Sequence, residues 1–141
     1  SGLYGLLRPM DLIQPYRLEM KTKLSNPEGK DLYSFWSDQL AEKINAETDT
    51  LINLASNEYF KALPKKTLKT KTITPVFKEF RDGKYRIIAF FAKKARGAMA
   101  KFILENRIDE PEGLKDFNGM GYTFNADLSK DLEWVFSRKV E

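Results

Sequence analysis

The strongest constraint on the fold is the Asp82-Gly83 pair, which separates two strand-like runs. Residues 71–80 mix lysines with β-branched residues in near-alternation, and residues 84–92, "KYRIIAFFA", are rich in strand formers. Asp-Gly is a strong signal for a two-residue hairpin because both turn residues must adopt positive φ. The sequence therefore predicts that residues 71–80 and 84–92 pair antiparallel. Pro75 lacks an amide donor, which predicts an edge position or a bulge in the first strand.

Two helices are predicted on either side of this hairpin. Residues 31–47 carry apolar side chains at helical spacing, and Asp31 is placed to cap the first turn. A second helix is expected from Ala95 to about Arg107. Its apolar positions are Ala95, Ala98, Met99, Phe102 and Ile103.

Shorter elements account for the rest of the chain. Residues 50–56 are expected to form a buried strand, and residues 57–63 a helical turn or two that Pro64 stops. An acidic turn with a short helix is expected at 109–117, and a closing pair of strands at 121–128 and 132–140. Residues 1–29 predict a short helical piece, extended chain and a turn at 26–29. The expected fold class is α+β, a single compact domain with an antiparallel hairpin packed on helices.

Composition excludes several classes of function. The chain has 141 residues, the size of one domain, and no apolar run approaches the roughly 20 residues of a membrane span. It has no cysteine and no histidine, so disulfides, thiolate nucleophiles and the commonest general base and metal ligand are missing. We therefore expect no metal site and no cofactor, and a reducing cytoplasmic location.

The charge is concentrated in the middle of the chain. Residues 61–101 hold 13 Lys and Arg against two acids, a net of +11, and the remaining residues hold 11 against 18, a net of −7. The two sums recover the formal net charge of +4. A basic centre between acidic flanks predicts a polyanionic partner, unless these lysines disperse over several faces of the folded chain.

The densest basic group surrounds Gly97 at the predicted start of the second helix. At 100° per residue, Lys93, Lys94 and Lys101 share the face that is opposite the apolar stripe. Glycine within a helix costs about 1 kcal/mol relative to alanine, and cations at a helix N-terminus oppose its dipole. These unfavourable choices coincide, which favours an anion site, and phosphate is a natural ligand for a helix N-terminus. The alternative is a helix start exposed to water.

Two further segments are weaker candidates for a site. "SGLYGLLRP", with Arg8, has glycines three apart, as in a helix-hairpin-helix module that grips a DNA backbone, but a glycine-rich turn explains it as well. "DEPE" at 109–112, with Asp116, offers carboxylates to a hard cation, and a solvated turn is the simpler interpretation.

Several segments together resemble the YaaA family of peroxide-stress proteins. They are "SGLYGLLRPMDLIQPYRLEM", "GKDLYSFW", "INLASNEYF", "PVFKEFRDGKYRIIAFFAKKARG", "ENRI" and "FNGMGYTF", which cover essentially the whole chain in order. The resemblance implies that residues 1–141 are the C-terminal portion of a larger YaaA-type α/β fold, with the N-terminal portion absent. It also implies a bacterial cytoplasmic protein that binds DNA through a basic cleft with a helix-hairpin-helix element and limits free intracellular iron.

The residues and the resemblance agree on a basic, anion-binding surface. The expected function is binding of double-stranded DNA in the peroxide response, by phosphate neutralisation with weak sequence specificity. No membrane partner is expected, and the missing N-terminal portion is a second expected partner. The candidate phosphate-binding residues are Lys93, Lys94, Arg96, Gly97, Lys101, Arg8, Arg17, Lys84 and Arg86. No catalytic residue and no metal ligand is assigned.

Two alternatives stay open at this point. The chain is an enzyme for a phosphorylated or nucleotide-like small molecule, with Lys94, Tyr59 or Glu58 as acid or base, since "NLASNEYFK" follows a strand as α/β sites often do. In the simpler interpretation of that segment, Ser56 or Asn57 caps a short helix. The other alternative is a structural half whose function needs the missing segment.

Overall fold

The computed structural model describes residues 2–139, which fall into two compact units. Unit 1 comprises Ser1–Asp49 and Ala55–Lys71, and unit 2 comprises Thr50–Leu54 and Thr72–Glu141. Unit 2 contains the sheet and the basic helix, and unit 1 contains short helices joined by irregular chain. The mixed α/β class expected from the sequence is confirmed.

The predicted hairpin forms in unit 2. Strand β2 (Lys71–Arg81) pairs antiparallel with β3 (Lys84–Arg86), and the turn residues Asp82 and Gly83 have φ of 50° and 76°. Both turn residues thus take the positive φ that the Asp-Gly signal requires. The predicted extent of the second strand was wrong, because β3 ends at Arg86 and a helix begins three residues later.

That helix, α4 (Ala89–Glu105), takes over the segment expected to be the end of the second strand. The helical stripe of Ala95 and Met99 continues backwards to Phe91 and Ala92, which are half-buried, whereas Phe90 is 61% exposed. A strand would have placed alternate residues on opposite faces, and the burial instead follows the period of a helix. The prediction that Phe90 and Phe91 belong to a strand was therefore wrong.

Around β2 the chain builds a mixed sheet with strand order β1-β2-β5-β4. Strand β1 (Thr50–Ile52) confirms the strand expected there. Strand β5 (Glu133–Lys139) runs parallel to β2, and β4 (Thr123–Phe124) pairs antiparallel with β5, which confirms the predicted closing pair. Position 140, the last of that predicted strand, lies outside the described residues.

Pro75 lies in an interior strand, so the expected edge position was wrong. Its neighbour Thr74 donates its amide to the carbonyl of Leu132 at 2.8 Å, on the β5 side. Successive amides of a strand point to opposite sides, so the nitrogen of Pro75 faces away from β5. The missing donor therefore costs no bond of the β2–β5 ladder.

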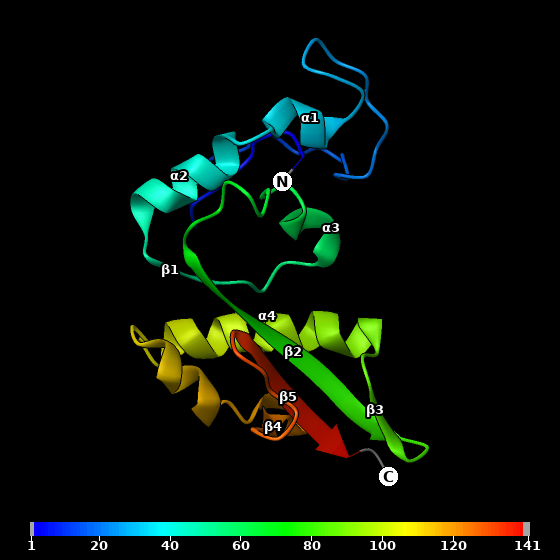
Figure 1. Cartoon of the computed structure of the whole chain (residues 1–141), viewed down its shortest axis with the longest axis vertical. Coiled ribbons are helices and arrows are strands. Elements are labelled where there is room, and N and C mark those ends of the chain that lie inside the picture. Colours follow the sequence, from blue (N-terminus) through cyan, green and yellow to red (C-terminus); the bar gives the residue numbers. More distant parts are fainter. Residues whose placement is uncertain (1, 140–141) are drawn as a thin grey trace. The chain divides into compact units, whose positions relative to one another are not determined.

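The core of unit 2 lies between the sheet and α4, which runs across β2 and β5 in Figure 1. Ile73 and Phe77 from β2 and Phe136 from β5 are at most 2% exposed, and Ala95 and Met99 of α4 are 0% exposed. The ring of Phe77 stacks on Phe136 with centroids 5.6 Å apart. Two 3-10 segments, Pro111–Asp116 and Gly119–Gly121, close this core, and the first confirms the short helix expected near 109–117.

In unit 1 the helix predicted at 31–47 is two helices, α1 (Leu32–Trp36) and α2 (Gln39–Glu47). The break is at Ser37, whose φ of 43° is left-handed and ends the first helix. The predicted cap is confirmed, since Asp31 Oδ1 accepts the amide of Ser34 at 2.8 Å. Helix α3 (Asn57–Phe60) forms before Pro64 as predicted.

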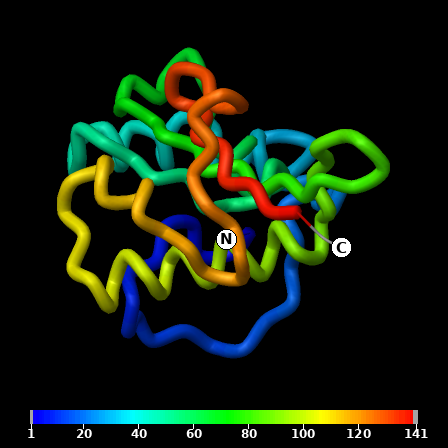
Figure 2. The backbone as a smooth tube through the Cα atoms, turned by 90° about the horizontal axis from the view of Figure 1, so that it is seen from below, coloured from blue at the N-terminus to red at the C-terminus, as the bar shows by residue number. Residues whose placement is uncertain are grey.

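Residues 2–30 are irregular chain with turns, blue in Figure 2, so the short helix expected there was wrong. The turn at 26–29 is confirmed by a bridge between Asn26 and Gly29. A Cβ on Gly5, whose φ is 67°, would lie 2.8 Å from the Trp36 ring. Gly5 thus packs against a tryptophan, and within residues 2–30 the structure has no helix that follows Gly5 as the second helix of a helix-hairpin-helix. Ser1, at the start of that segment, lies outside the described residues.

Candidate functional site

The basic side chains expected to share one face of the helix do so on α4. Lys93, Lys94, Gly97 and Lys101 are all exposed. The buried Ala95 and Met99 lie on the opposite side of the same helix, against the sheet. The helical periodicity of the sequence therefore placed these four residues correctly.

Their position along the helix differs from the prediction. Because α4 begins at Ala89, Lys93 is its fifth residue and the basic group lies in the second to fourth turns. The free amides of an α-helix belong to its first turn, so they do not point at this group. The predicted position of this group at the helix N-terminus was therefore wrong, and the phosphate site stays a prediction that rests on the lysine charges.

The lysines differ in their contacts. Lys94 Nζ lies 4.4 Å from the centroid of the exposed Phe90 ring, and Lys101 Nζ lies 3.6 Å from Glu105 Oε1. Within residues 2–139 no ion pair involves Lys93. This face thus offers three ammonium groups, one of which is shared with a carboxylate.

Arg96 and Gly97 depart from their expected roles in different ways. Arg96 is half-buried, and its Nε donates to the carbonyl of Ala92 at 3.3 Å, so it lies aside from the lysines. A Cβ on Gly97 would meet no atom within 4 Å. Close approach of another described segment of unit 2 is therefore not the reason for the glycine, and the backbone there is open to an external group.

The hairpin carries two more of the candidates. Lys84 and Arg86 are exposed on β3, directly opposite Arg81 and Glu79 of β2. Paired residues of an antiparallel ladder have side chains on the same face, so all four share one face of the sheet. Arg86 Nη1 lies 3.8 Å from Asp82 Oδ2, an exposed pair.

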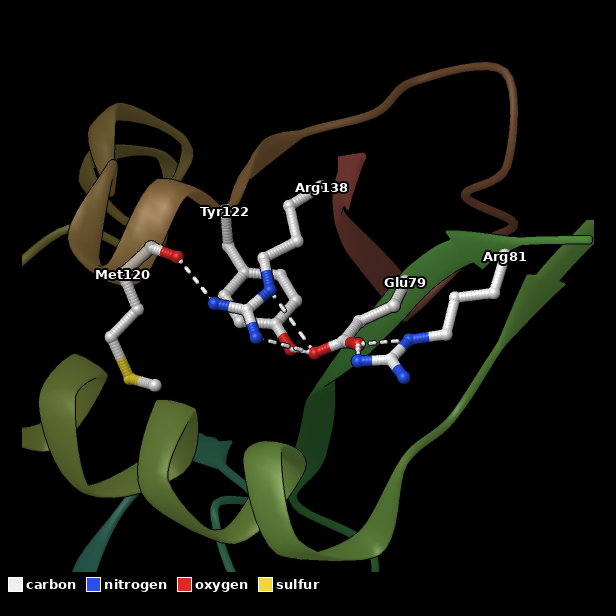
Figure 3. A network of polar contacts seen from close by, with 5 residues as sticks. All are labelled: Glu79, Arg81, Met120, Tyr122 and Arg138. Carbon is white, nitrogen blue, oxygen red and sulfur yellow. Dashed lines mark hydrogen bonds and ion pairs between the residues drawn. The ribbon is translucent and has the colours of Figure 1, made fainter. Parts of the chain in front are cut away.

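A polar cluster of unit 2 that was not predicted centres on Glu79 (Figure 3). This carboxylate is 0% exposed, and the Arg81 and Arg138 guanidiniums approach it from either side. Oε2 accepts Nε and Nη2 of Arg81 at 2.8 and 2.6 Å. Oε1 accepts Nη2 of Arg138 at 2.5 Å and the Tyr122 hydroxyl at 3.0 Å. Arg138 Nη1 donates to the carbonyl of Met120 at 2.8 Å.

The electrostatics of this cluster favour the ionised carboxylate. Burial by itself raises the pKa of Glu79, but hydrogen bonds from Arg138, Arg81 and Tyr122 outweigh it and hold the pKa below its usual value. Burial and the hydrogen bond to Glu79 raise the pKa of Tyr122 to about 12. Two guanidiniums and one carboxylate leave a net charge of +1. Both arginines also lie over the Phe91 ring, with 4.8 Å from Arg138 and 5.8 Å from Arg81 to the ring centroid.

A signal for this cluster was present in the sequence. Ile73, Phe77 and Glu79 fall on one face of β2 at period two, so an acid occupies a core position. A buried carboxylate requires cations or donors around it. The period-two pattern would have predicted that Glu79 has such partners, although not which residues supply them.

The remaining candidates belong to unit 1. Arg17 is exposed, and Arg8 Nη2 lies 3.4 Å from Glu47 Oε1 on α2. Glu58 and Tyr59, the acid–base candidates of the enzyme alternative, lie in α3, where Glu58 Oε1 accepts the amide of Lys21 at 3.2 Å. Of the nine phosphate-binding candidates, Arg8 and Arg17 thus lie in unit 1 and the other seven lie in unit 2.

Residues 2–139 contain no group of three or more His, Cys, Asp or Glu side chains arranged to hold a metal ion, and "DEPE" with Asp116 forms none. No helix in the described part of the chain has the length and apolar character needed to cross a membrane.

Comparison with known proteins finds one family. A family model described as "Peroxide stress protein YaaA" matches residues 1–128. A UPF0246 protein of Alteromonas mediterranea is 59% identical over 146 aligned residues, and one of Saccharophagus degradans is 55% identical over 144. One of Paraburkholderia xenovorans is 52% identical over 147. The alignments cover 99–100% of this chain and 56% of each relative, so the chain spans about half the length of the curated relatives it matches.

Proposed function

Because the chain belongs to the peroxide stress protein YaaA family, we propose that it binds the phosphate backbone of double-stranded DNA as part of the peroxide response. The family membership supplies the peroxide stress. The DNA partner comes from the resemblance to the family, the exposed cations of unit 2 support it, and the activity of the longer relatives is part of the same proposal.

The observation that carries the proposal is the outer face of α4. Lys93, Lys94 and Lys101 are exposed there, and the bare backbone of Gly97 lies between them with open space above it. Residues 93 and 101 are eight apart, or roughly 12 Å along a helix that rises 1.5 Å per residue. Phosphates of one B-DNA strand recur about every 3.4 Å along the axis, so this face spans several of them.

The hairpin supplies further exposed cations within unit 2. Lys84 and Arg86 on β3 add two cations, and Arg86 can present two parallel donors to a phosphate. Contacts of this kind fix position without reading bases, so we expect weak sequence preference. The binding should also weaken steeply with salt, because each neutralised phosphate releases condensed counterions.

The test compares charge reversals within unit 2. Lys93→Glu/Lys94→Glu should make the negative slope of log affinity against log salt shallower by about two, because two phosphate contacts are lost. The control variant is Lys130→Glu/Lys139→Glu, which reverses two exposed lysines elsewhere in the unit and should leave the slope near that of the wild type. Equal slopes for the wild type and the α4 variant would refute the proposal.

The resemblance to the family also implies a role in limiting free intracellular iron, and the proposal includes that role. We infer that this region contributes through its nucleic-acid contacts, since the exposed groups that gather on α4 are cations and suit phosphates. Fluorescence quenching by Fe²⁺ under anaerobic conditions would test this directly. Stoichiometric, micromolar iron binding by the chain would overturn the indirect role and leave the DNA test unaffected.

A further inference from the structure

A second basic surface lies in unit 1, in a segment to which no role has been assigned. We call residues 61–71 the lysine loop. Its exposed lysines are Lys61, Lys65, Lys66, Lys69 and Lys71. From 61 to 78 the sequence holds six lysines and no acid. Within residues 2–139 none of the loop's lysines takes part in an ion pair.

The loop is held in one conformation by the side chain of Asn45 on α2. Asn45 Nδ2 donates to the carbonyl of Thr67 at 2.8 Å. Its Oδ1 accepts the amides of Lys69 and Thr70 at 2.9 and 3.1 Å and the hydroxyl of Thr70 at 2.9 Å. One neutral side chain thus fixes the backbone on both sides of residue 68.

Other contacts anchor the start of the loop. Ala62 and Leu63 are 7% and 9% exposed, and the carbonyl of Pro64 accepts the amides of Thr67 and Leu68 at 3.0 and 2.9 Å. The hydroxyl of Thr67 donates a hydrogen bond to the carboxylate of Asp38. The backbone is therefore ordered from residue 62 to residue 71, while the lysine side chains extend into solvent.

Five like charges on one ordered loop repel each other, and this arrangement gains energy when a polyanion lies against it. An ordered backbone also reduces the entropy lost on binding, because the positions of the charges are set beforehand. A run of phosphates is complementary to such a surface in charge.

We propose that the lysine loop is a second phosphate-contacting surface for duplex DNA, with Asn45 as its positioning residue. This inference rests on the proposed function, since it names the same partner. The loop contacts belong to unit 1, and they add to the salt dependence independently of α4.

The experiment measures affinity for one 20-base-pair duplex at several salt concentrations. Lys65→Glu/Lys66→Glu should reduce the steepness of the negative slope of log affinity against log salt by about two. The control, Lys23→Glu/Lys30→Glu, makes the same change of charge on exposed lysines of the same unit and should lower it by much less. Asn45→Ala removes no charge, so the slope should stay within about 0.5 of the wild type while affinity falls about three- to tenfold.

The outcomes separate the two claims. If the loop variant has the wild-type slope while Lys93→Glu/Lys94→Glu has a shallower slope, the lysine loop does not contact phosphates. The proposed function is then unaffected. Normal slopes for both variants overturn both. Equal losses in the loop variant and in its control reduce the effect to net charge and overturn the specific surface.

Two further results bear on Asn45 and on the partner. Unchanged affinity of a cooperatively folded Asn45→Ala chain overturns the positioning role. If that variant fails to fold, Asn45→Ser, which keeps one small polar group, replaces it with the same expected direction. Tighter binding to phosphatidylserine vesicles than to the duplex, abolished by Lys65→Glu/Lys66→Glu, would assign the loop to a lipid surface instead.

Discussion

Replacing the Glu79 carboxylate by an amide tests whether the buried cluster stabilises unit 2. Glu79→Gln keeps the size of the side chain but removes its charge and introduces an NH₂ group facing two guanidiniums. In the wild type, Glu79 Oε2 accepts two bonds from Arg81, and Oε1 accepts bonds from Arg138 and Tyr122. The amide cannot accept at both positions, so at least one guanidinium loses its partner.

The size of the effect follows from burial. Removing one partner of a buried ion pair typically costs 3–5 kcal/mol, because the other charge stays buried and unpaired. The side chain of Arg138 is 17% exposed, whereas that of Arg81 is 38% exposed and can be rehydrated. We therefore expect the free energy of unfolding to fall by about 3 kcal/mol, at the lower end of that range.

The pH dependence of the loss has a definite sign. The pKa of Glu79 in the folded chain is below its unfolded value, which is about 4.3 for a glutamate. Its stabilisation is therefore complete above about pH 4.3 and is lost as the pH falls through the lower, folded-state pKa. The difference in unfolding free energy between wild type and variant should be constant near pH 6–8 and should shrink in acid.

Urea unfolding, followed by the fluorescence of Trp134 in β5, supplies the measurement. Glu133→Gln is the control, because Glu133 is exposed in β5, the strand next to that of Glu79, and takes part in no ion pair within residues 2–139. A loss below about 1 kcal/mol in Glu79→Gln, or a loss that does not shrink in acid, would refute the reasoning.

Three more predictions concern single elements, and each is tested by urea unfolding. Asp31→Ala removes the cap of α1 and should cost about 1 kcal/mol; no change would mean that the cap bond contributes nothing. Met99→Ala should cost about 2–5 kcal/mol, whereas Leu104→Ala, 72% exposed on the same helix, should cost less than 1; similar losses would contradict the assigned core face. Gly97→Ala should stabilise the chain by about 1 kcal/mol, and destabilisation would show that the space around Gly97 is occupied.

The hairpin was predictable because its signal is local. Asp82 and Gly83 fix the turn through their own backbone preferences, whatever the rest of the chain does. The lysines of α4 were also placed on the right face, since the period of a helix depends only on spacing. The start of α4 was not predictable in this way, because Phe90 and Phe91 suit a strand and a helix equally until the core they pack against is known.

The missed features depend on contacts between distant segments. Arg138 meets Glu79 across 59 residues of sequence, and Asn45 reaches the lysine loop across 22 to 25 residues. Both residues look ordinary in their own segments. The acid on the core face of β2 was the one clue available in advance, and it predicts that partners exist without naming them.

The central claim is that this chain binds DNA by its phosphates, and the salt dependence of wild-type binding tests it most directly. Five exposed cations in unit 2 are assigned to phosphates, namely Lys84, Arg86, Lys93, Lys94 and Lys101. At about 0.9 per neutralised phosphate, the slope of log affinity against log salt should be −4.5 or steeper, and equal for two duplexes of unrelated sequence. A slope shallower than about −2, or no duplex binding at 50 mM salt, would contradict the claim.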